Sequence, residues 1–322
     1  MEAIGRRRAC APNFKRYSIT GERDVLQTRK LGGSSARRWL GSLELNQGRG
    51  RSNMEKKWFI VDAHQHIRVG SYIYASQIPR EKEEDQLKKE IAYFKEWFDR
   101  YGVAYSAVSN ISPMVDRVWK TRHGGNEAVV ELVKQLKGKV IGQYVPNVFE
   151  SPDLVREKVE EAIRDLGFRG VKLHPWVAAF PLNHPMVYAV FDVAARYRIP
   201  VLSHSARSEF CTPMLFADIA MRYPEVPVIM GHMGKQHLHY DVLPAMRLAE
   251  NIFLATSGSK LQILLEKAVE EFGAERVLFG TDGPHELLPA YVARIEDLNV
   301  SEEAKELILG KNAAKLFKLP TG

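Results

Sequence analysis

The 322-residue chain carries a formal net charge of +7, but this charge is concentrated at one end. Residues 1–53 hold 12 Lys and Arg against 4 Asp and Glu, whereas the remainder is close to neutral. The near-neutral body argues against a nucleic-acid binder, and no apolar run approaches the roughly 18 residues that a membrane span requires. Because 45% of the residues are hydrophobic, the composition predicts a globular protein with a sizeable core and neither a membrane nor a nucleic-acid partner.

The N-terminal residues indicate where the folded domain begins, and the cysteines indicate the cellular compartment. Residues 1–53 lack both periodicity and the apolar core of a secretory signal, and Met54, just before the first predicted strand, resembles a natural start. We therefore predict a disordered or non-native extension over residues 1–53 and one domain over residues 54–322. The two cysteines, Cys10 and Cys211, imply no disulfide framework, which favours a reducing, cytoplasmic location.

After residue 53, short β-branched runs alternate with amphipathic helical stretches. A helix is predicted over residues 82–100, where apolar residues follow helical spacing. Eight strand-helix units in about 260 residues are typical of an α/β protein with a single-domain (β/α)8 TIM barrel. An open doubly wound sheet alternates in the same way, but it usually carries a Gly-rich turn after the first strand, where this chain has histidines. The predicted strands cover residues 59–64, 103–108, 140–145, 170–174, 199–204, 226–232, 252–256 and 277–282.

Polar residues recur at the carboxyl ends of these strands. His64 and His66 are one residue apart, so a strand directs both side chains the same way. Any one such histidine is more often structural, and Asp282 could simply cap a helix. A closed barrel, however, gathers all the strand ends on one face, where neutral imidazoles and a carboxylate form the ligand set of a catalytic zinc or related divalent ion. The strand-end residues are His64, His66, Lys172, His174, His204, His232 and Asp282.

Ordered motifs along the body resemble one family. The chain looks like the amidohydrolase superfamily, specifically its amidohydrolase-related branch of metal-dependent hydrolases and nonoxidative decarboxylases. The resemblance extends over residues 58–319. Its motifs are VDAHQH at 61–66, GVKLHP at 170–175, LSH at 202–204, GHMG at 231–234, FGTD at 279–282 and NAAKLF at 312–317.

The resemblance implies a role for each strand-end residue. It implies that Asp282 both binds the metal and takes a proton from its water, and that His232 polarises the substrate or shuttles a proton. A carboxylated lysine bridges two ions in some members, so Lys172 leaves a second ion open. We favour one divalent ion, zinc, with Lys172 and His174 as substrate-binding groups. The implied metal ligands are His64, His66, His204 and Asp282.

The leading functional prediction is a metal-dependent hydrolase. Metal-activated water would attack a small amide, lactone or ester. The alternative is a metal-dependent nonoxidative decarboxylase of a small carboxylic acid, and the ligand set does not separate the two. Arg207 and several aromatic residues lie in the loops after the first, second, fourth and fifth predicted strands, and an aromatic-lined mouth with an arginine suits a small carboxylated or cyclic substrate. The alternative is that these aromatic residues simply close the loops over the barrel. Whether the protein forms a homo-oligomer is left open. The loop aromatic residues considered are Tyr72, Tyr74, Trp119, Trp176 and Phe180.

Overall fold

The chain from Asn53 to Gly322 forms one compact unit in the computed structural model. The predicted extension over residues 1–53 lies outside the described residues. The structure describes residues 58–70, 82–112, 121–136, 138–283 and 287–321.

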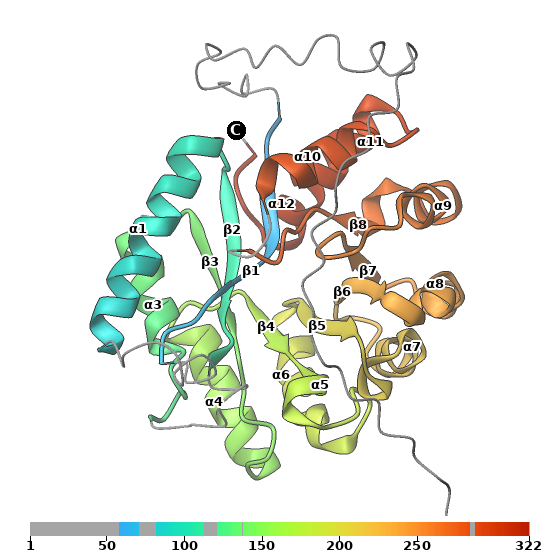
Figure 1. Ribbon diagram of the computed structural model, residues 1–322. Helices are drawn as coiled ribbons and strands as arrows, with labels where there is room; N and C mark the ends of the chain where they lie inside the picture. Colours follow the sequence, from blue (N-terminus) through green and yellow to red (C-terminus); the bar gives the residue numbers. More distant parts are fainter. Residues whose placement is uncertain (1–57, 71–81, 113–120, 137, 284–286, 322) are drawn as a thin grey trace, which may run out of the picture. The chain divides into compact units, whose positions relative to one another are not determined.

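Eight strands form a single sheet in sequence order, and each pairs in parallel with the next. Figure 1 shows these strands at the centre with the helices around them. The predicted α/β TIM barrel is confirmed, and all eight strands begin within two residues of the predicted position. The strands are β1 (Val61–Ile67), β2 (Tyr105–Asn110), β3 (Val140–Tyr144), β4 (Gly170–Leu173), β5 (Val201–Ala206), β6 (Val228–Lys235), β7 (Ile252–Ala255) and β8 (Val277–Leu278).

The first and last strands are joined by backbone hydrogen bonds that close the barrel. Ala63 N donates to Phe279 O at 2.9 Å, and Asp282 N donates to His64 O at 2.8 Å. The pairing of β8 with β7 stops at Leu278, so residues 279–282, predicted as strand, continue along β1 as irregular backbone. This seam between β1 and the segment after β8 carries much of the candidate site.

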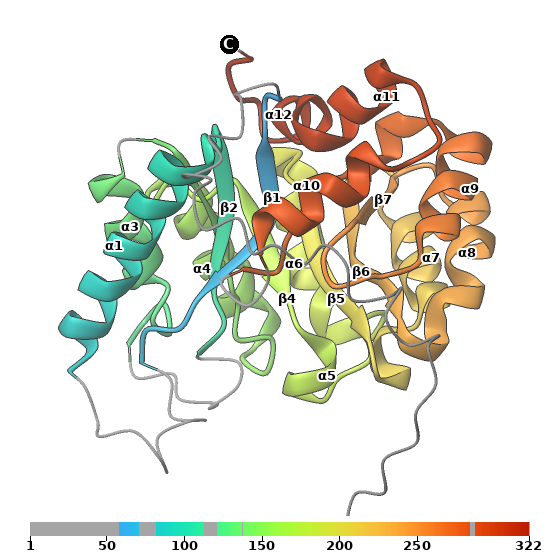
Figure 2. The same ribbon diagram turned by 45° about the horizontal axis from the view of Figure 1, so that its top comes forward.

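The helices pack their apolar faces against the outside of the barrel. The view turned by 45° shows the helices around the strands (Figure 2). Within the described part of the chain, no helix is long and apolar enough to cross a membrane. A π-helical turn, Leu307–Lys311, joins the last two helices. The α-helices are α1 (Glu83–Tyr101), α3 (Glu127–Gln135), α4 (Pro152–Arg164), α5 (Pro175–Ala178), α6 (Tyr188–Tyr197), α7 (Pro213–Arg222), α8 (Val242–Leu248), α9 (Gln262–Phe272), α10 (Leu288–Glu296), α11 (Glu302–Glu306) and α12 (Asn312–Leu316).

A separate apolar cluster collects one residue or more from most of the strands. Val61, Ile141, Leu202 and Leu278 are buried in it, and Phe317 packs against the same group. These residues fill the interior of the barrel below the strand ends, as bulky side chains do in this fold. The packed interior leaves chemistry to the residues at the carboxyl ends of the strands.

Candidate metal centre

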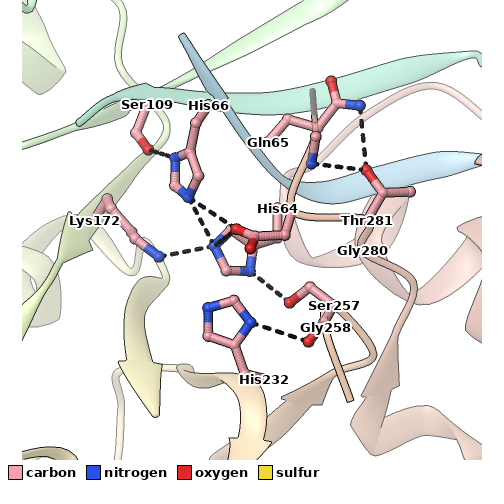
Figure 3. A network of polar contacts seen from close by, with 12 residues as sticks. His64, Gln65, His66, Ser109, Lys172, His232, Ser257, Gly258, Gly280 and Thr281 are labelled. Atoms are coloured by element: carbon pink, nitrogen blue, oxygen red, sulfur yellow. Dashed lines mark hydrogen bonds and ion pairs between the residues drawn. The ribbon is translucent and has the colours of Figure 1, made fainter. Parts of the chain in front are cut away.

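Three side chains from the two sides of the seam meet at one point: His64, His66 and Asp282. Figure 3 shows the two histidines of this group with their rings close together. The Nε2 atoms of His64 and His66 are 3.1 Å apart. Asp282 Oδ1 lies 3.6 Å from the first and 3.3 Å from the second. Two ligands about 2.1 Å from an ion are about 3.0 Å apart at a right angle and about 3.4 Å apart at the tetrahedral angle. The three atoms therefore have the spacing of one face of a coordination sphere, and this donor set can hold a divalent metal ion.

A β-bulge in β1 directs the two histidines inward. The register with β2 shifts between Asp62 and Gln65, so β1 uses one residue more than its partner there. Val61 and Ala63 belong to the interior cluster, and strict alternation after them would turn His64 to the opposite face. The extra residue reverses the alternation, which is how bulges re-aim side chains beside active sites.

Two serines, neither of them predicted, orient the imidazoles. His66 Nδ1 lies 2.8 Å from Oγ of Ser109, a residue of β2. His64 Nδ1 lies 2.7 Å from Oγ of Ser257, which comes just after β7. When Nδ1–H donates to the hydroxyl, the lone pair of Nε2 is left for the metal, and such outer partners fix both tautomer and ring orientation. Serine is too common at strand ends to be recognised as such a partner from sequence.

The surroundings keep the imidazoles neutral, which is the form that binds a metal. Burial lowers the pKa of His66 to about 4 and holds the pKa of His64 well below its usual range. Burial raises the pKa of Asp282, but its contact with His66 and its electrostatic interactions with His232 and Lys172 outweigh this effect, so the pKa lies below its usual range. Two neutral nitrogen donors and one carboxylate are a hard-to-borderline set suited to Zn²⁺ or Mn²⁺.

Asp62 and Thr281 tie the two sides of the seam together. Asp62 Oδ1 accepts hydrogen bonds from the backbone N–H groups of His64 and Thr281, both at 3.1 Å, and Oδ2 accepts from Thr281 Oγ1 at 2.6 Å. The next residue, Asp282, has φ of 65°, which costs about 1 kcal/mol for a side chain with a Cβ. The hydrogen bonds on Thr281 hold this backbone in place, so they position the carboxylate of Asp282 beside His64 and His66.

We expect Thr281→Val to weaken metal binding by about 10-fold or more, because it removes the hydroxyl while keeping the side-chain volume. Thr281→Ser keeps the hydroxyl and should bind metal within about 3-fold of the parent chain. The dissociation constants are measured by competition with a chromophoric chelator. Equal metal affinity in the two variants would show that the hydroxyl has no positioning role.

Lys172, on β4, reaches the cluster from across the barrel. Its side chain is fully buried, and Nζ lies 2.8 Å from His64 Nε2. Burial lowers the pKa of Lys172 to about 7, although the charge of Asp282 acts in the opposite direction. An amine in this place, rather than an apolar core residue, offers hydrogen-bond donors to an anion bound beside the metal.

His232, on β6, contacts the cluster without joining it. Its ring centroid is 4.9 Å from that of His64, and its Nδ1 lies 3.0 Å from the carbonyl oxygen of Ser257. Ser257 thus orients two histidines at once, one through its hydroxyl and one through its carbonyl. Burial lowers the pKa of His232 to about 4.

His204 and His174 form a stack beside the three-residue cluster. Their ring centroids are 4.0 Å apart at an interplanar angle of 16°, and Trp176 stacks on His204 at 5.7 Å. The three ligand atoms that lie within 4.8 Å of one another belong to His64, His66 and Asp282, so His204 stands apart from them in this geometry. Its buried Nε2 has no hydrogen-bond partner among the described residues, which fits an atom that an ion or a substrate would satisfy.

The predicted aromatic and arginine mouth is described only in part. Arg207 is exposed, and its guanidinium lies over the Trp176 ring, 5.5 Å from the centroid. Trp176 is 40% exposed, whereas Phe180 is buried in the outer core. The remaining three aromatic residues of that prediction lie outside the described residues: Tyr72, Tyr74 and Trp119.

The family model described as Amidohydrolase matches residues 61–319, which include both sides of the seam and all the strand ends. The chain belongs to the amidohydrolase family. Gamma-resorcylate decarboxylase of Polaromonas sp. strain JS666 is a curated relative with 24% identity over 279 residues, covering 69% of this chain and 85% of the relative.

Solved structures share the barrel. One is a dihydroxybenzoic acid decarboxylase of Polaromonas sp. JS666 with bound manganese and the inhibitor 2-nitroresorcinol, with a TM-score of 0.64, 18% identity, and coverage of 82% of this chain and 98% of that one. Another is 5-carboxyvanillate decarboxylase of Novosphingobium aromaticivorans complexed with manganese and a nitrobenzoic acid, with a TM-score of 0.64, 16% identity, and coverage of 82% and 97%.

These comparisons overturn the leading functional prediction from sequence. A hydrolase was predicted, but the curated relative and both of these structures are decarboxylases, so that prediction is wrong and its stated alternative is favoured. The physical reason for the error is that a metal held by two histidines and an aspartate can activate water or hold a carboxylate equally well. The ligand set alone carries no information on which of the two occurs.

Proposed function

We propose that this enzyme is a metal-dependent nonoxidative decarboxylase of a small aromatic carboxylic acid. The proposal rests mainly on one observation. Three side chains that can hold one divalent ion lie together, and Nζ of the fully buried Lys172 is within hydrogen-bond distance of one of them, His64. A carboxylate is the group that both would bind. The similarity to gamma-resorcylate and 5-carboxyvanillate decarboxylases supports a hydroxylated benzoate as the substrate.

The metal would be held by His64, His66 and Asp282, with the unpartnered Nε2 of His204 available as a further donor. When bound, the ion supplies Lewis-acid stabilisation of negative charge on substrate oxygens. Zn²⁺ is the ion predicted from sequence, and the manganese in the related structures makes Mn²⁺ the second candidate. The described residues offer one such cluster, which agrees with a single ion.

The residues of the chain would bind the acid and transfer one proton. Lys172 donates hydrogen bonds to the substrate carboxylate, and burial excludes water that would weaken this contact. The bond between the ring carbon and the carboxyl carbon breaks, carbon dioxide leaves, and one proton joins the ring carbon. His232 and Asp282, the two predicted catalytic residues, would hold this proton and pass it on, and their positions next to His64 support these roles. His174 and Arg207 would contact the substrate from the neighbouring stack.

The test is an assay of the full chain loaded with Mn²⁺ or Zn²⁺. With 2,6-dihydroxybenzoate or 5-carboxyvanillate, we expect carbon dioxide and the decarboxylated phenol in equal amounts, and no product after removal of the metal by a chelator. Small lactones and amides serve as the comparison and should remain intact. Release of no carbon dioxide from any hydroxylated benzoate would contradict the proposal.

A further inference from the structure

A short segment after β7, residues 256–258, contacts two of the histidines that the proposed function uses. Ser257, in the middle of this segment, is fully buried. Its hydroxyl oxygen lies 2.7 Å from His64 Nδ1, and its carbonyl oxygen lies 3.0 Å from His232 Nδ1. Figure 3 shows Ser257 beside both rings. A displacement of this one residue would therefore disturb a proposed metal ligand and the proposed proton-transfer residue together.

The carbonyl oxygen of Ser257 fixes the tautomer of His232. A carbonyl oxygen accepts hydrogen bonds and donates none, so Nδ1 of the neutral imidazole carries the proton and donates it. The second ring nitrogen, Nε2, then has the lone pair. The position of this carbonyl group therefore decides which nitrogen of His232 carries the proton.

Gly258 packs directly against His232. A Cβ at residue 258 would lie 2.9 Å from His232 Nδ1, which is closer than real Cβ atoms come to other heavy atoms. The φ of 66° at this residue is left-handed and also favours glycine. Because no side chain fits between the backbone of residue 258 and the imidazole, a movement of this backbone is transmitted to the ring.

Two hydroxyl groups hold the ends of the 256–258 segment. Thr256 Oγ1 donates to the carbonyl oxygen of Gly280 and accepts from the N–H of the same glycine, both at 3.1 Å. At the other end, the Gly258 N–H donates to the hydroxyl oxygen of Tyr291 at 2.9 Å. Tyr291 lies in the first turn of α10 and is 6% exposed. The segment is therefore tied to β8 on one side and to a helix outside the barrel on the other.

The Tyr291 hydroxyl is the one acceptor that the Gly258 N–H has among the residues that the structure describes. Residue 258 is buried, and a buried N–H that loses its acceptor is costly to leave unpaired. Without the hydroxyl, the backbone would shift toward another acceptor or toward water. That shift would move the Ser257 carbonyl, which belongs to the adjoining peptide group.

We propose that Tyr291 is a positioning residue for the candidate metal centre. Its hydroxyl holds Gly258, and Gly258 holds Ser257 between the two imidazoles. Tyr291 thereby sets the orientation of His64 and the tautomer of His232 at once. This inference rests on the proposed function, since it takes one histidine as a metal ligand and the other as the residue that transfers the proton. It adds that a helix outside the barrel controls both roles through one hydrogen bond.

The first measurement is the zinc dissociation constant of the full chain, determined by competition with a chromophoric chelator. We expect Ser257→Ala, which removes the direct partner of His64, to weaken zinc binding by about 10- to 100-fold, and Tyr291→Phe to weaken it by about 3- to 10-fold. In the Ser257→Ala background, Tyr291→Phe should add less than about 2-fold, because substitutions along one chain of contacts are not additive.

The second measurement is the nuclear magnetic resonance signal of His232 Nδ1–H in protein with isotope-labelled histidine. The signal is identified by its absence from His232→Asn. We expect Tyr291→Phe to shift this signal, and to shift it in the Ser257→Ala background as well, because the carbonyl group is part of the backbone and remains in that variant. This readout requires neither metal nor substrate.

The matched control is Tyr223→Phe, at the end of α7. The Tyr223 hydroxyl donates to Asp192 at 3.0 Å, so the control removes a comparable hydrogen bond between outer helices. It should change neither the zinc constant nor the His232 signal. If Tyr291→Phe does not fold, Thr256→Val releases the other end of the segment and should weaken zinc binding by about 3- to 10-fold, whereas Thr256→Ser should not. A parent-like zinc constant for Thr256→Val would then overturn the proposal.

Two results with Tyr291→Phe would also overturn the proposal. Loss of thermal stability alone, with the zinc constant and the His232 signal of the parent chain, would make Tyr291 a structural residue. Full additivity with Ser257→Ala in zinc binding would show that Tyr291 acts by another route. Failure of the proposed reaction is separate, because neither readout involves a substrate. A parent chain that binds zinc but releases no carbon dioxide contradicts the decarboxylase and leaves the two readouts to decide on Tyr291.

Discussion

His64→Ala combined with His66→Ala is expected to abolish metal binding and reduce turnover to background while the barrel stays folded. The two Nε2 atoms form one edge of the ligand triangle, and Asp282 alone is too weak a site for a divalent ion at micromolar concentration. The measurements are metal content after dialysis against chelator-free buffer, turnover, and the far-UV circular dichroism spectrum.

The matched control for this double variant is His184→Ala with His237→Ala, because both of these histidines are exposed. The control protein should keep the metal and its activity. The assignment also predicts a difference in ligand-induced stability: added metal should raise the unfolding temperature of the control but not that of the His64 and His66 variant, because only a protein that binds the ion is stabilised by it. Unchanged metal content in the double variant would remove the basis of the metal centre.

His232→Asn should retain the metal and lose about 10²- to 10⁴-fold in kcat, the range expected for removing a general acid or base. An asparagine amide can still donate to the Ser257 carbonyl, so the local structure is kept, but it lacks the Nε2 atom that a substrate or proton requires. The measurement is kcat with metal affinity determined on the same preparation.

His237→Asn is the control, since this exposed histidine lies on the short 3₁₀ segment that follows β6. Its kcat should stay within about 3-fold of the parent value. Loss of metal from His232→Asn would place His232 among the ligands and favour a second ion. Full turnover would exclude it from catalysis.

The orientation of β1 illustrates a limit of sequence patterns. The period of two correctly indicated that His64 and His66 share a face, because alternation is a local property of extended backbone. It did not indicate which face, since the bulge after Asp62 depends on the pairing with β2. In the same way, residues 279–282 have the composition of a strand end, yet the pairing with β7 stops at Leu278 and Asp282 takes a left-handed conformation.

The partners of the predicted residues could not be read from the sequence. Ser257 contacts His64 across 193 residues of chain, and Thr281 contacts Asp62 across 219. Nothing in the composition or spacing around a serine or threonine distinguishes one that orients a ligand from one at an ordinary strand end. Phe180 is a similar case, because the sequence left open whether this loop aromatic lines the mouth or closes the loop over the barrel, and the structure buries it in the outer core.

The sequence by itself determined the barrel, the strand ends that carry chemistry and the family. Strand and helix periodicity are local, and the motifs at residues 61–66 and 279–282 lie in the segments that meet in the site. Only the tertiary structure decided which of the predicted ligands converge and that Ser109 and Ser257 orient them. The physical reason is that barrel closure brings β1 against the segment after β8, and distances across such a closure depend on bulges and register that no short stretch of sequence encodes.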